Sequence, residues 1–265
     1  MQYTLGFIGC GNMGGALITA AAKNVDGTKI AVCDFDKAKV NKFETTLGVI
    51  GVTAEELAQN SKFVVLGVKP QVMEATLSPL AEILRERKDV TIVTMAAGLS
   101  INAIRSYIGK DLPVIRIMPN TPVTLGAGMV LFTSDGVSVE TETEFLTAFK
   151  AAGKFDKLPE EKIDAGSALS GCGPAFVYAF AEALADGGVE CGLPRDKAAL
   201  YAAQTLLGAA EMLLAFGHPA DLKDAVCSPG GTTIAGIHAL EESGFRGAAM
   251  NAVLSAYKRT LELKK

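Results

Sequence analysis

The chain has 265 residues, 49% of them apolar, so it can form one large domain or two modest ones with a buried core, and disorder is excluded over most of its length. The formal net charge is −4 and no basic run occurs, so nucleic acid and anionic membranes are not expected partners. No uninterrupted apolar run reaches the roughly 20 residues that span a bilayer, so no membrane segment is expected.

The first half of the chain alternates strand-like and helix-like segments. Strands are predicted at residues 3–8, 29–33, 63–67, 90–94 and 114–118, helices at 13–22, 37–45 and 73–87, and edge strands at 128–133 and 154–157. Continuous Val/Ile runs between helices are typical of a parallel sheet covered on both faces. We therefore predict an α/β fold that begins with a Rossmann-type doubly wound sheet.

The second half shows no convincing strand from about Glu160 onward. Helices are predicted at 177–186, 195–216, 233–243 and 245–263, with Gly192 and Pro194 as start signals and Gly217 as a stop signal. We expect two domains, with the sheet in residues 1–158 and only helices in residues 159–265.

The stretch Gly9-Cys10-Gly11-Asn12-Met13-Gly14 matches G-x-G-x-x-G between the first predicted strand and the first predicted helix. The first glycine permits a tight turn, the second lets the backbone approach a pyrophosphate, and the third lets helix and strand pack closely. The helix N-terminus then offers N–H groups to the anion. A glycine-rich turn without a ligand is the alternative, but the position after a strand favours a nicotinamide dinucleotide.

Asp34 ends the second predicted strand, 20 residues after Gly14. An acidic residue at about this spacing typically hydrogen-bonds the ribose 2′-OH of NAD and repels the 2′-phosphate of NADP. Two alternatives stay open: Asp34, like Asp36, caps the next helix, or Lys37 and Lys39 reach a 2′-phosphate. The sequence favours NADH over NADPH.

Three further turns follow predicted strands at the edge where a doubly wound sheet binds ligands. They are residues 68–71 (Val-Lys-Pro-Gln), 95–98 (Met-Ala-Ala-Gly) and 118–122 (Met-Pro-Asn-Thr-Pro). Each alone reads as an ordinary βα turn. Beside the glycine loop they outline a crevice, in which the small residues of the second turn let a nicotinamide lie against backbone.

Residues 227–234 (Cys-Ser-Pro-Gly-Gly-Thr-Thr-Ile) precede a predicted helix. Hydroxyls and bare N–H groups at a helix N-terminus form an anion site suited to one carboxylate. An interhelical turn with Ser/Thr capping is the alternative.

Residues 170–174 (Ser-Gly-Cys-Gly-Pro) interrupt an otherwise helical pattern. Cys172 within them is not expected to be a nucleophile because both histidines, His218 and His238, lie far from it in sequence.

The five cysteines have irregular spacings and form no CxxC pair. A disulfide framework or a metal site is therefore not expected, and a reducing compartment fits.

Residues from Met1 onward enter a strand pattern without the basic and apolar regions of a signal peptide. We expect a cytoplasmic protein.

The chain resembles the pyrroline-5-carboxylate reductase family over essentially its whole length. The resemblance rests on residues 6–14, 68–70, 96–98, 118–122, 169–175, 185–189 with 192–195, and 222–224 through 228–234. Many dehydrogenases share the first stretch, and very few share the last. The resemblance implies hydride transfer from NAD(P)H to the C=N carbon of 1-pyrroline-5-carboxylate, which gives L-proline in the last step of proline biosynthesis.

The resemblance also implies roles for individual residues. The cofactor is expected on Ile8, Gly9, Cys10, Gly11, Asn12, Met13, Gly14, Asp34, Val68, Lys69, Pro70, Met95, Ala96, Ala97 and Asn120. The substrate carboxylate is expected on Ser228, Gly230, Gly231, Thr232 and Thr233, and the predicted catalytic residues are Thr233 and Glu160. The family's helical domain interlocks with a second subunit, which implies a dimer or a ring of dimers.

Two positions depart from the family pattern, and two rival functions remain. Many members carry a small polar residue in place of Asp34 and prefer NADPH, and some carry asparagine in place of Ala225. One rival is a β-hydroxyacid dehydrogenase, but none of the lysines in the helical half stands in a convincing catalytic site. The other is a dinucleotide-sensing module without catalysis, for which a second anion site has no use.

Overall fold

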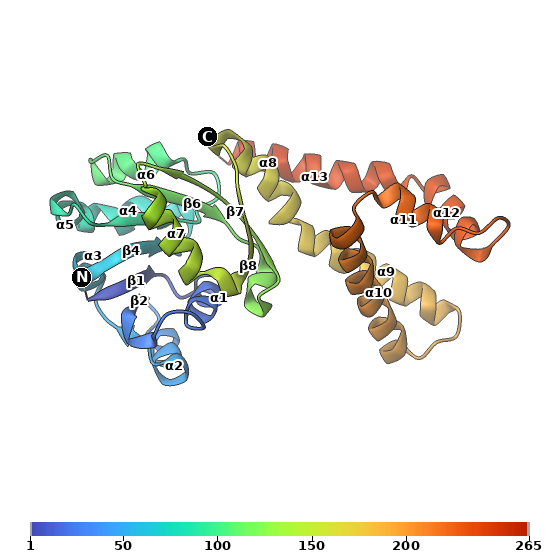
Figure 1. The fold of residues 1–265 in the computed structure, drawn as a ribbon, viewed down its shortest axis with the longest axis horizontal. Helices are drawn as coiled ribbons and strands as arrows, with labels where there is room; N and C mark the ends of the chain where they lie inside the picture. The colour runs from blue at the N-terminus through green and yellow to red at the C-terminus, as the bar shows by residue number, and fades with distance from the viewer. Residues whose placement is uncertain (1, 264–265) are drawn as a thin grey trace. The chain divides into compact units, whose positions relative to one another are not determined.

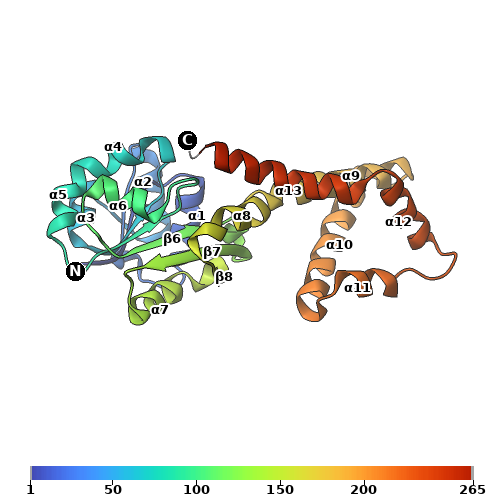
Figure 2. The same ribbon diagram turned by 90° about the horizontal axis from the view of Figure 1, so that it is seen from above.

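The computed structural model describes residues 2–263, which form two compact units (Figures 1 and 2). We call residues 2–172 with 257–263 the sheet unit, and residues 173–256 the helical unit.

The sheet unit is built on a sheet with strand order β3-β2-β1-β4-β5-β6-β7-β8. The strands are β1 (Tyr3–Ile8), β2 (Ile30–Cys33), β3 (Ile50–Gly51), β4 (Ser61–Leu66), β5 (Thr91–Thr94), β6 (Val114–Met118), β7 (Gly128–Asp135) and β8 (Gly153–Lys157). Strands β1 to β6 run parallel, with Leu5 opposite both Ile30 and Phe63. The predicted doubly wound sheet is confirmed, and the two-residue strand β3 was missed.

Strand β7 departs from the predicted parallel arrangement. It is antiparallel to β6 and parallel to β8, so β8 lies at the edge of the sheet and β7 lies inside it. The connection from β6 to β7 holds only the short 3-10 turn η4 (Thr121–Leu125). A parallel return needs a crossover of a dozen or more residues, so this short connection reverses the chain direction.

Helices cover both faces of the sheet (Figure 1). They are α1 (Asn12–Ala21), α2 (Lys37–Leu47), α3 (Ala54–Asn60), α4 (Met73–Leu77), α5 (Ala81–Glu86), α6 (Ile101–Ile108) and α7 (Val139–Ala148). The single helix predicted over 73–87 is divided into α4, the turn η3 (Ser78–Leu80) and α5. Pro79 explains the division, because proline has no backbone N–H and its ring clashes with the preceding turn.

The core lies on the two faces of the central strands. In β4, Phe63 and Val65 belong to the cluster under α1, α2 and α7, and Val64 and Leu66 belong to the cluster under α3 to α6. This alternation explains why the strand reads as one continuous apolar run. The Phe145 ring of α7 lies 5.9 Å from Phe63 and extends the first cluster.

Helix α8 (Glu160–Ser170) closes the sheet unit. Its Ile163 is fully buried against Met118 and Leu131, and a side chain on Gly166 would lie 2.5 Å from a Leu131 methyl carbon. The predicted boundary at residue 159 coincides with the residue that precedes α8. Because α8 packs on β7, the compact sheet unit continues to Cys172.

The helical unit contains no strand within its described residues 173–256. Its helices are α9 (Gly173–Glu190), α10 (Arg195–Phe216), α11 (Pro219–Ala225), α12 (Thr232–Glu242) and α13 (Phe245–Glu262), and the last turns of α13 group with the sheet unit. Helix α10 begins at Arg195, as predicted after Pro194. Small side chains let α9 and α10 pack closely, with Ala185, Ala198 and Ala202 buried between them.

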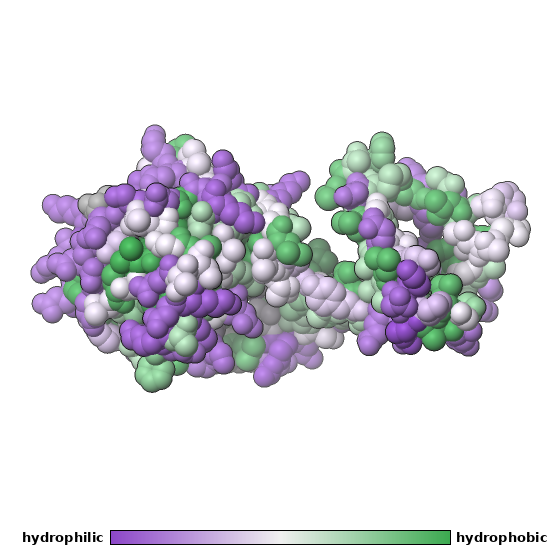
Figure 3. All heavy atoms as spheres, turned by 90° about the horizontal axis from the view of Figure 1, so that it is seen from below, coloured by the Kyte–Doolittle hydropathy of each residue, from purple (hydrophilic) through white to green (hydrophobic). Residues whose placement is uncertain are grey.

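The helical unit leaves many large apolar side chains exposed, and Figure 3 shows green side chains over much of its surface. They include Leu200, Leu207, Leu214, Phe216, Met250 and Leu254. Residues 160–190 and 195–216 form helices long and apolar enough to cross a membrane by length and composition alone. Both stretches contain charged residues, so neither is an uninterrupted apolar run, and the expectation of no membrane segment stays a prediction.

Candidate active site

Five parallel strands end at one edge of the sheet, and every predicted cofactor residue of the sheet unit lies there. The Gly67 N–H donates to the Ile8 carbonyl and the Gly9 N–H donates to the Cys33 carbonyl, both at 2.8 Å. These hydrogen bonds join the ends of β4, β1 and β2. The glycine loop, Asp34, Val68 to Pro70, Met95 to Ala97 and Asn120 follow β1, β2, β4, β5 and β6 along this edge.

The glycines of the loop have distinct environments. Gly9 has a φ of +105°, and a side chain there would lie 2.7 Å from the Gly67 backbone. A side chain on Gly14 would lie 2.2 Å from the Gly9 carbonyl oxygen. A side chain on Gly11 would meet nothing within 4 Å. Gly9 and Gly14 are therefore required by the fold, whereas the space above Gly11 is open for a ligand.

The loop fits the pyrophosphate of a dinucleotide. Gly11 precedes the first residue of α1, and no side chain caps this helix terminus. The N–H groups of the first helical turn point out of the helix with no partner in their own helix. Together with the helix dipole they attract an anion. An uncapped terminus beneath open space therefore suits a phosphate group.

The Asp34 carboxylate is held in place by two backbone groups. Its Oδ2 accepts from the Cys10 N–H at 2.6 Å, and its Oδ1 accepts from the Asp36 N–H at 2.9 Å. The side chain that caps α2 is Asp36, which accepts from the Ala38 N–H at 3.0 Å. Asp34 is thus fixed against the glycine loop and does not cap the following helix.

The Cys10 thiol lies within this loop and is buried. Burial, and secondarily the negative charge of Asp34, raises the pKa of Cys10 to about 12. The thiol therefore stays protonated at neutral pH, which leaves it a poor nucleophile.

Asn120, a predicted cofactor residue, holds two structural hydrogen bonds. The Asn120 amide donates to the Ser170 carbonyl at 2.9 Å, and its oxygen accepts from the Met129 N–H at 3.0 Å. Asn120 is 8% exposed. Its side chain thereby joins the end of β6 to α8 and β7, and a contact with the cofactor stays a prediction.

Glu160 belongs to a charged cluster that the sequence did not reveal. Its Oε1 accepts from the Ile101 N–H, at the start of α6, at 2.7 Å, and lies 3.3 Å from Arg116 Nη1. The Arg116 Nη2 donates to Asp164 Oδ1 at 2.6 Å, and Arg116 is 1% exposed. A catalytic role for Glu160 stays a prediction, but its carboxylate already braces α6 and α8 against β6.

A charged side chain inside an apolar strand was the available signal for this cluster. Arg116 is the third residue of β6, Val-Ile-Arg-Ile-Met, in which every residue is buried. A buried guanidinium needs hydrogen-bonded acidic partners. The sequence offers many carboxylates, and only the fold selects Asp164 and Glu160.

The predicted substrate residues lie on one exposed turn of the helical unit. The Gly231 N–H donates to the Ser228 carbonyl at 3.0 Å, and Gly230 has a φ of +65°. Helix α12 begins at Thr232 without a side-chain cap. Thr232 and Thr233 are exposed in its first turn. Exposed threonines and the uncapped N–H groups of a helix terminus therefore lie on the same turn, which suits a carboxylate.

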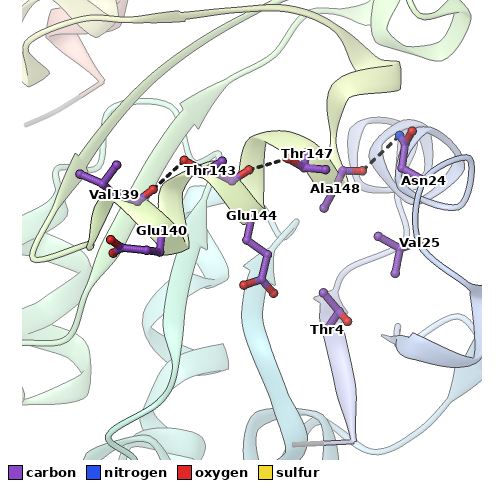
Figure 4. A pocket seen from close by; sticks show the side chains of 9 residues that line it. All are labelled: Thr4, Asn24, Val25, Val139, Glu140, Thr143, Glu144, Thr147 and Ala148. Carbon is purple, nitrogen blue, oxygen red and sulfur yellow. Dashed lines mark hydrogen bonds between the residues drawn. The ribbon is translucent and has the colours of Figure 1, made fainter.

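A hollow of about 540 Å³ in the sheet unit lies apart from the predicted site residues. It lies between α7, the end of α1 and the start of β1, away from the glycine loop (Figure 4). Thr143 and Thr147 donate to the carbonyls of Val139 and Thr143 in their own helix. The Asn24 amide lies 3.4 Å from the Ala148 carbonyl. Thr143, Thr147 and Asn24 are thus directed to backbone groups, and Glu144 pairs with Lys62.

Comparison with known proteins matches one family model to the first part of the chain and another to the second. A family model described as "Pyrroline-5-carboxylate reductase dimerisation" matches residues 160–263, and one described as "NADP oxidoreductase coenzyme F420-dependent" matches residues 4–98. Pyrroline-5-carboxylate reductase of Glycine max is 42% identical over 99% of this chain and 96% of its own length. The Escherichia coli enzyme is 38% identical over 100% of both chains.

Solved structures agree with this assignment. A pyrroline-5-carboxylate reductase of Coxiella burnetii superposes with a TM-score of 0.91 at 31% identity over 100% of both chains. The Plasmodium falciparum pyrroline carboxylate reductase, solved with NADP bound, gives a TM-score of 0.88 at 29% identity over 100% of both chains. The resemblance read from the sequence is confirmed: this chain belongs to the pyrroline-5-carboxylate reductase family.

Proposed function

We propose that this chain reduces 1-pyrroline-5-carboxylate to L-proline, with NADH as the preferred hydride donor. The observation that carries the proposal is the uncapped, hydroxyl-rich turn from Ser228 to Thr233, in a chain that also holds an open glycine loop. A dinucleotide sensor needs the second feature alone, and the β-hydroxyacid dehydrogenase alternative has no lysine of the helical half in a convincing catalytic site. Membership in the reductase family supports the same reaction.

The residues of the chain mainly orient the reactants. When bound, the dihydronicotinamide supplies the hydride that reaches the C=N carbon. The imine nitrogen takes its proton from solution before the transfer, so no strong protein acid is needed. The free N–H groups and hydroxyls from Ser228 to Thr233 hold the substrate carboxylate, and the glycine loop holds the pyrophosphate. Fixing both reactants lowers the entropic part of the barrier.

The preference for NADH is argued from the charges around Asp34. The Cys10 N–H fixes this carboxylate at the loop where the adenosine ribose lies in Rossmann folds. It would meet a 2′-phosphate with a like charge. Lys39 lies beside the loop, but its ammonium is 3.8 Å from Asp36, which offsets part of its charge.

Matched charge removals test this preference. Asp34→Asn and Asp36→Asn each remove one negative charge and keep one acceptor oxygen, and the first also replaces one of the two oxygens that Asp34 uses by an amide NH2. We expect the ratio of kcat/KM for NADH to that for NADPH to exceed one in the wild type. It should fall at least about tenfold in Asp34→Asn, the effect of about 1.4 kcal/mol, and change little in Asp36→Asn. Equal changes in both variants, or a wild-type preference for NADPH, would contradict the proposal.

The substrate site is tested by Thr233→Ala, with Thr143→Ala on α7 as the control. Losing a hydrogen bond to a carboxylate costs about 1.5–3 kcal/mol. We therefore expect KM for pyrroline-5-carboxylate to rise and kcat/KM to fall by about tenfold to a hundredfold in Thr233→Ala alone. Unchanged kinetics would refute the carboxylate site, and absence of wild-type turnover with either nicotinamide would refute the reaction.

Self-association through the helical unit accounts for its apolar surface. The matched family is named for dimerisation, and the exposed large apolar side chains of α10 and α13 suit a protein interface. We therefore assign the exposed apolar faces of α9, α10 and α13 to contact between subunits, as a dimer or a ring of dimers, rather than to a membrane. The five free cysteines support a reducing, cytoplasmic location.

A further inference from the structure

We propose that Phe35 is the platform on which the adenine of the dinucleotide stacks, a role that rests on the proposed cofactor and sharpens it. Phe35 directly follows Asp34 at the carboxyl edge of the sheet. It is 103% exposed, the largest value among the exposed apolar side chains of the described residues. A free phenyl ring at this point is a site for an apolar, flat partner.

The backbone around Phe35 is held on both sides. Asp34 Oδ1 accepts from the Asp36 N–H at 2.9 Å, which closes a turn around Phe35. Asp34 Oδ2 is anchored to the Cys10 N–H, and Asp36 caps α2 through the Ala38 N–H. The ring is therefore carried on a fixed turn. Stacking of a base on the ring does not require the loop to become ordered first.

The chemistry of the dinucleotide places its base beside this ring. The acidic residue after the second strand of such a sheet contacts the ribose 2′-OH. The adenine is attached to C1′, the carbon next to C2′, so the neighbour of Asp34 is within reach of the base. Aromatic side chains stack on nucleobases through their faces, and both faces of Phe35 are free of protein contacts.

Three variants and two cofactors test the platform. Phe35→Ala removes the ring, Phe35→Leu keeps apolar bulk, and Phe35→Tyr keeps the aromatic face. Binding of NADH to the full-length protein is measured by calorimetry without substrate. Turnover is measured with NADH and with reduced nicotinamide mononucleotide, which lacks the adenosine half. Because the wild-type ring contacts no protein, none of the variants should change Tm.

We expect Phe35→Ala to weaken NADH binding and lower kcat/KM for NADH by about fivefold to a hundredfold. Phe35→Leu should lose nearly as much, and Phe35→Tyr should retain wild-type values. Turnover with the mononucleotide should be the same in all four proteins. A ring that only supported the loop would instead lower turnover with both cofactors and shift Tm.

Two results would overturn the platform. One is unchanged NADH binding in Phe35→Ala, and the other is an equal loss with the mononucleotide. Where NADH binding is unchanged, an altered subunit number on gel filtration would place the ring in a contact between copies of the chain. If the wild type binds NADH but does not turn over pyrroline-5-carboxylate, the reaction fails and the binding comparison still decides the platform.

Discussion

The guanidinium of Arg116 donates to the carboxylate of Asp164 at 2.6 Å, and the two residues are 1% and 2% exposed. This pair joins β6 to α8 within the interior of the sheet unit. Removing one partner of a buried ion pair leaves a desolvated charge, which costs about 3–5 kcal/mol. We expect Asp164→Ala to lower the free energy of unfolding by about that amount in urea titrations.

The matched double variant separates charge from packing. Replacing the pair by apolar side chains, Arg116→Met with Asp164→Leu, removes the buried charges together, although Glu160 then loses its partner at 3.3 Å. We expect this protein to be more stable than Asp164→Ala. A double variant that is less stable than the single variant would show that the charges themselves are required.

Glu160 provides a second test because its carboxylate holds the start of α6. Glu160→Gln keeps an acceptor for the Ile101 N–H, so we expect kcat within a few-fold of the wild type. Glu160→Ala removes the acceptor and should cost about 0.5–2 kcal/mol of stability, as the loss of a helix cap does. If Glu160 is a general acid, Glu160→Gln should instead lower kcat by about a hundredfold or more and remove one limb of the pH–rate profile.

The glycine loop predicts opposite outcomes for two alanine substitutions. The methyl group of Gly11→Ala meets no protein atom within 4 Å. Stability should therefore stay the same, while KM for the cofactor rises at least about tenfold, the effect of about 1.4 kcal/mol of lost binding. The methyl group of Gly14→Ala lies 2.2 Å from the Gly9 carbonyl oxygen. This variant should lose about 1–3 kcal/mol of stability. Thermal melts of both variants measure the change in stability, and steady-state kinetics measure KM for the cofactor.

Cys10 is expected to resist alkylation. Its pKa is raised to about 12, mainly by burial, so the thiolate that reacts with iodoacetamide is scarce at pH 8. Mass spectrometry should find label on the exposed Cys191 and none on Cys10 in the folded protein. Asp34→Asn removes the smaller cause of the shift and leaves burial, so Cys10 should remain unlabelled. Rapid labelling in that variant would make the charge of Asp34 the main cause.

The parts of the fold that the sequence predicted are those with strong local signals. Strands β1 and β6 match their predicted residues. Helix α10 begins after Pro194 and ends before Gly217, as the proline start signal and the glycine stop signal predict. Helices α3, α6 and α7 were missed, although Thr53, Ser100 and Ser138 cap them through side chains. These helices are short, and most of their stability comes from packing on the sheet, which one sequence does not display.

The candidate site also has parts that the sequence predicts and parts that only the fold reveals. The turn from Ser228 to Thr233 and the glycine loop are continuous stretches, so spacing alone locates them. The partners of Asp34 and Glu160 are separated along the chain, by 24 residues for the Cys10 N–H and by 59 for the Ile101 N–H. Hydrogen bonds across such distances follow from the strand order, which brings distant residues to one edge.

The helical unit has almost no interior of its own, since Ala185, Ala198 and Ala202 are its buried apolar residues within the described part of the chain. Three alanines contribute little transfer free energy. If subunit contact supplies the remaining burial, the folding equilibrium includes a second-order step, and Tm depends on protein concentration. Dilution then acts on this protein as a denaturant does, and newly made chains complete their fold only on meeting another.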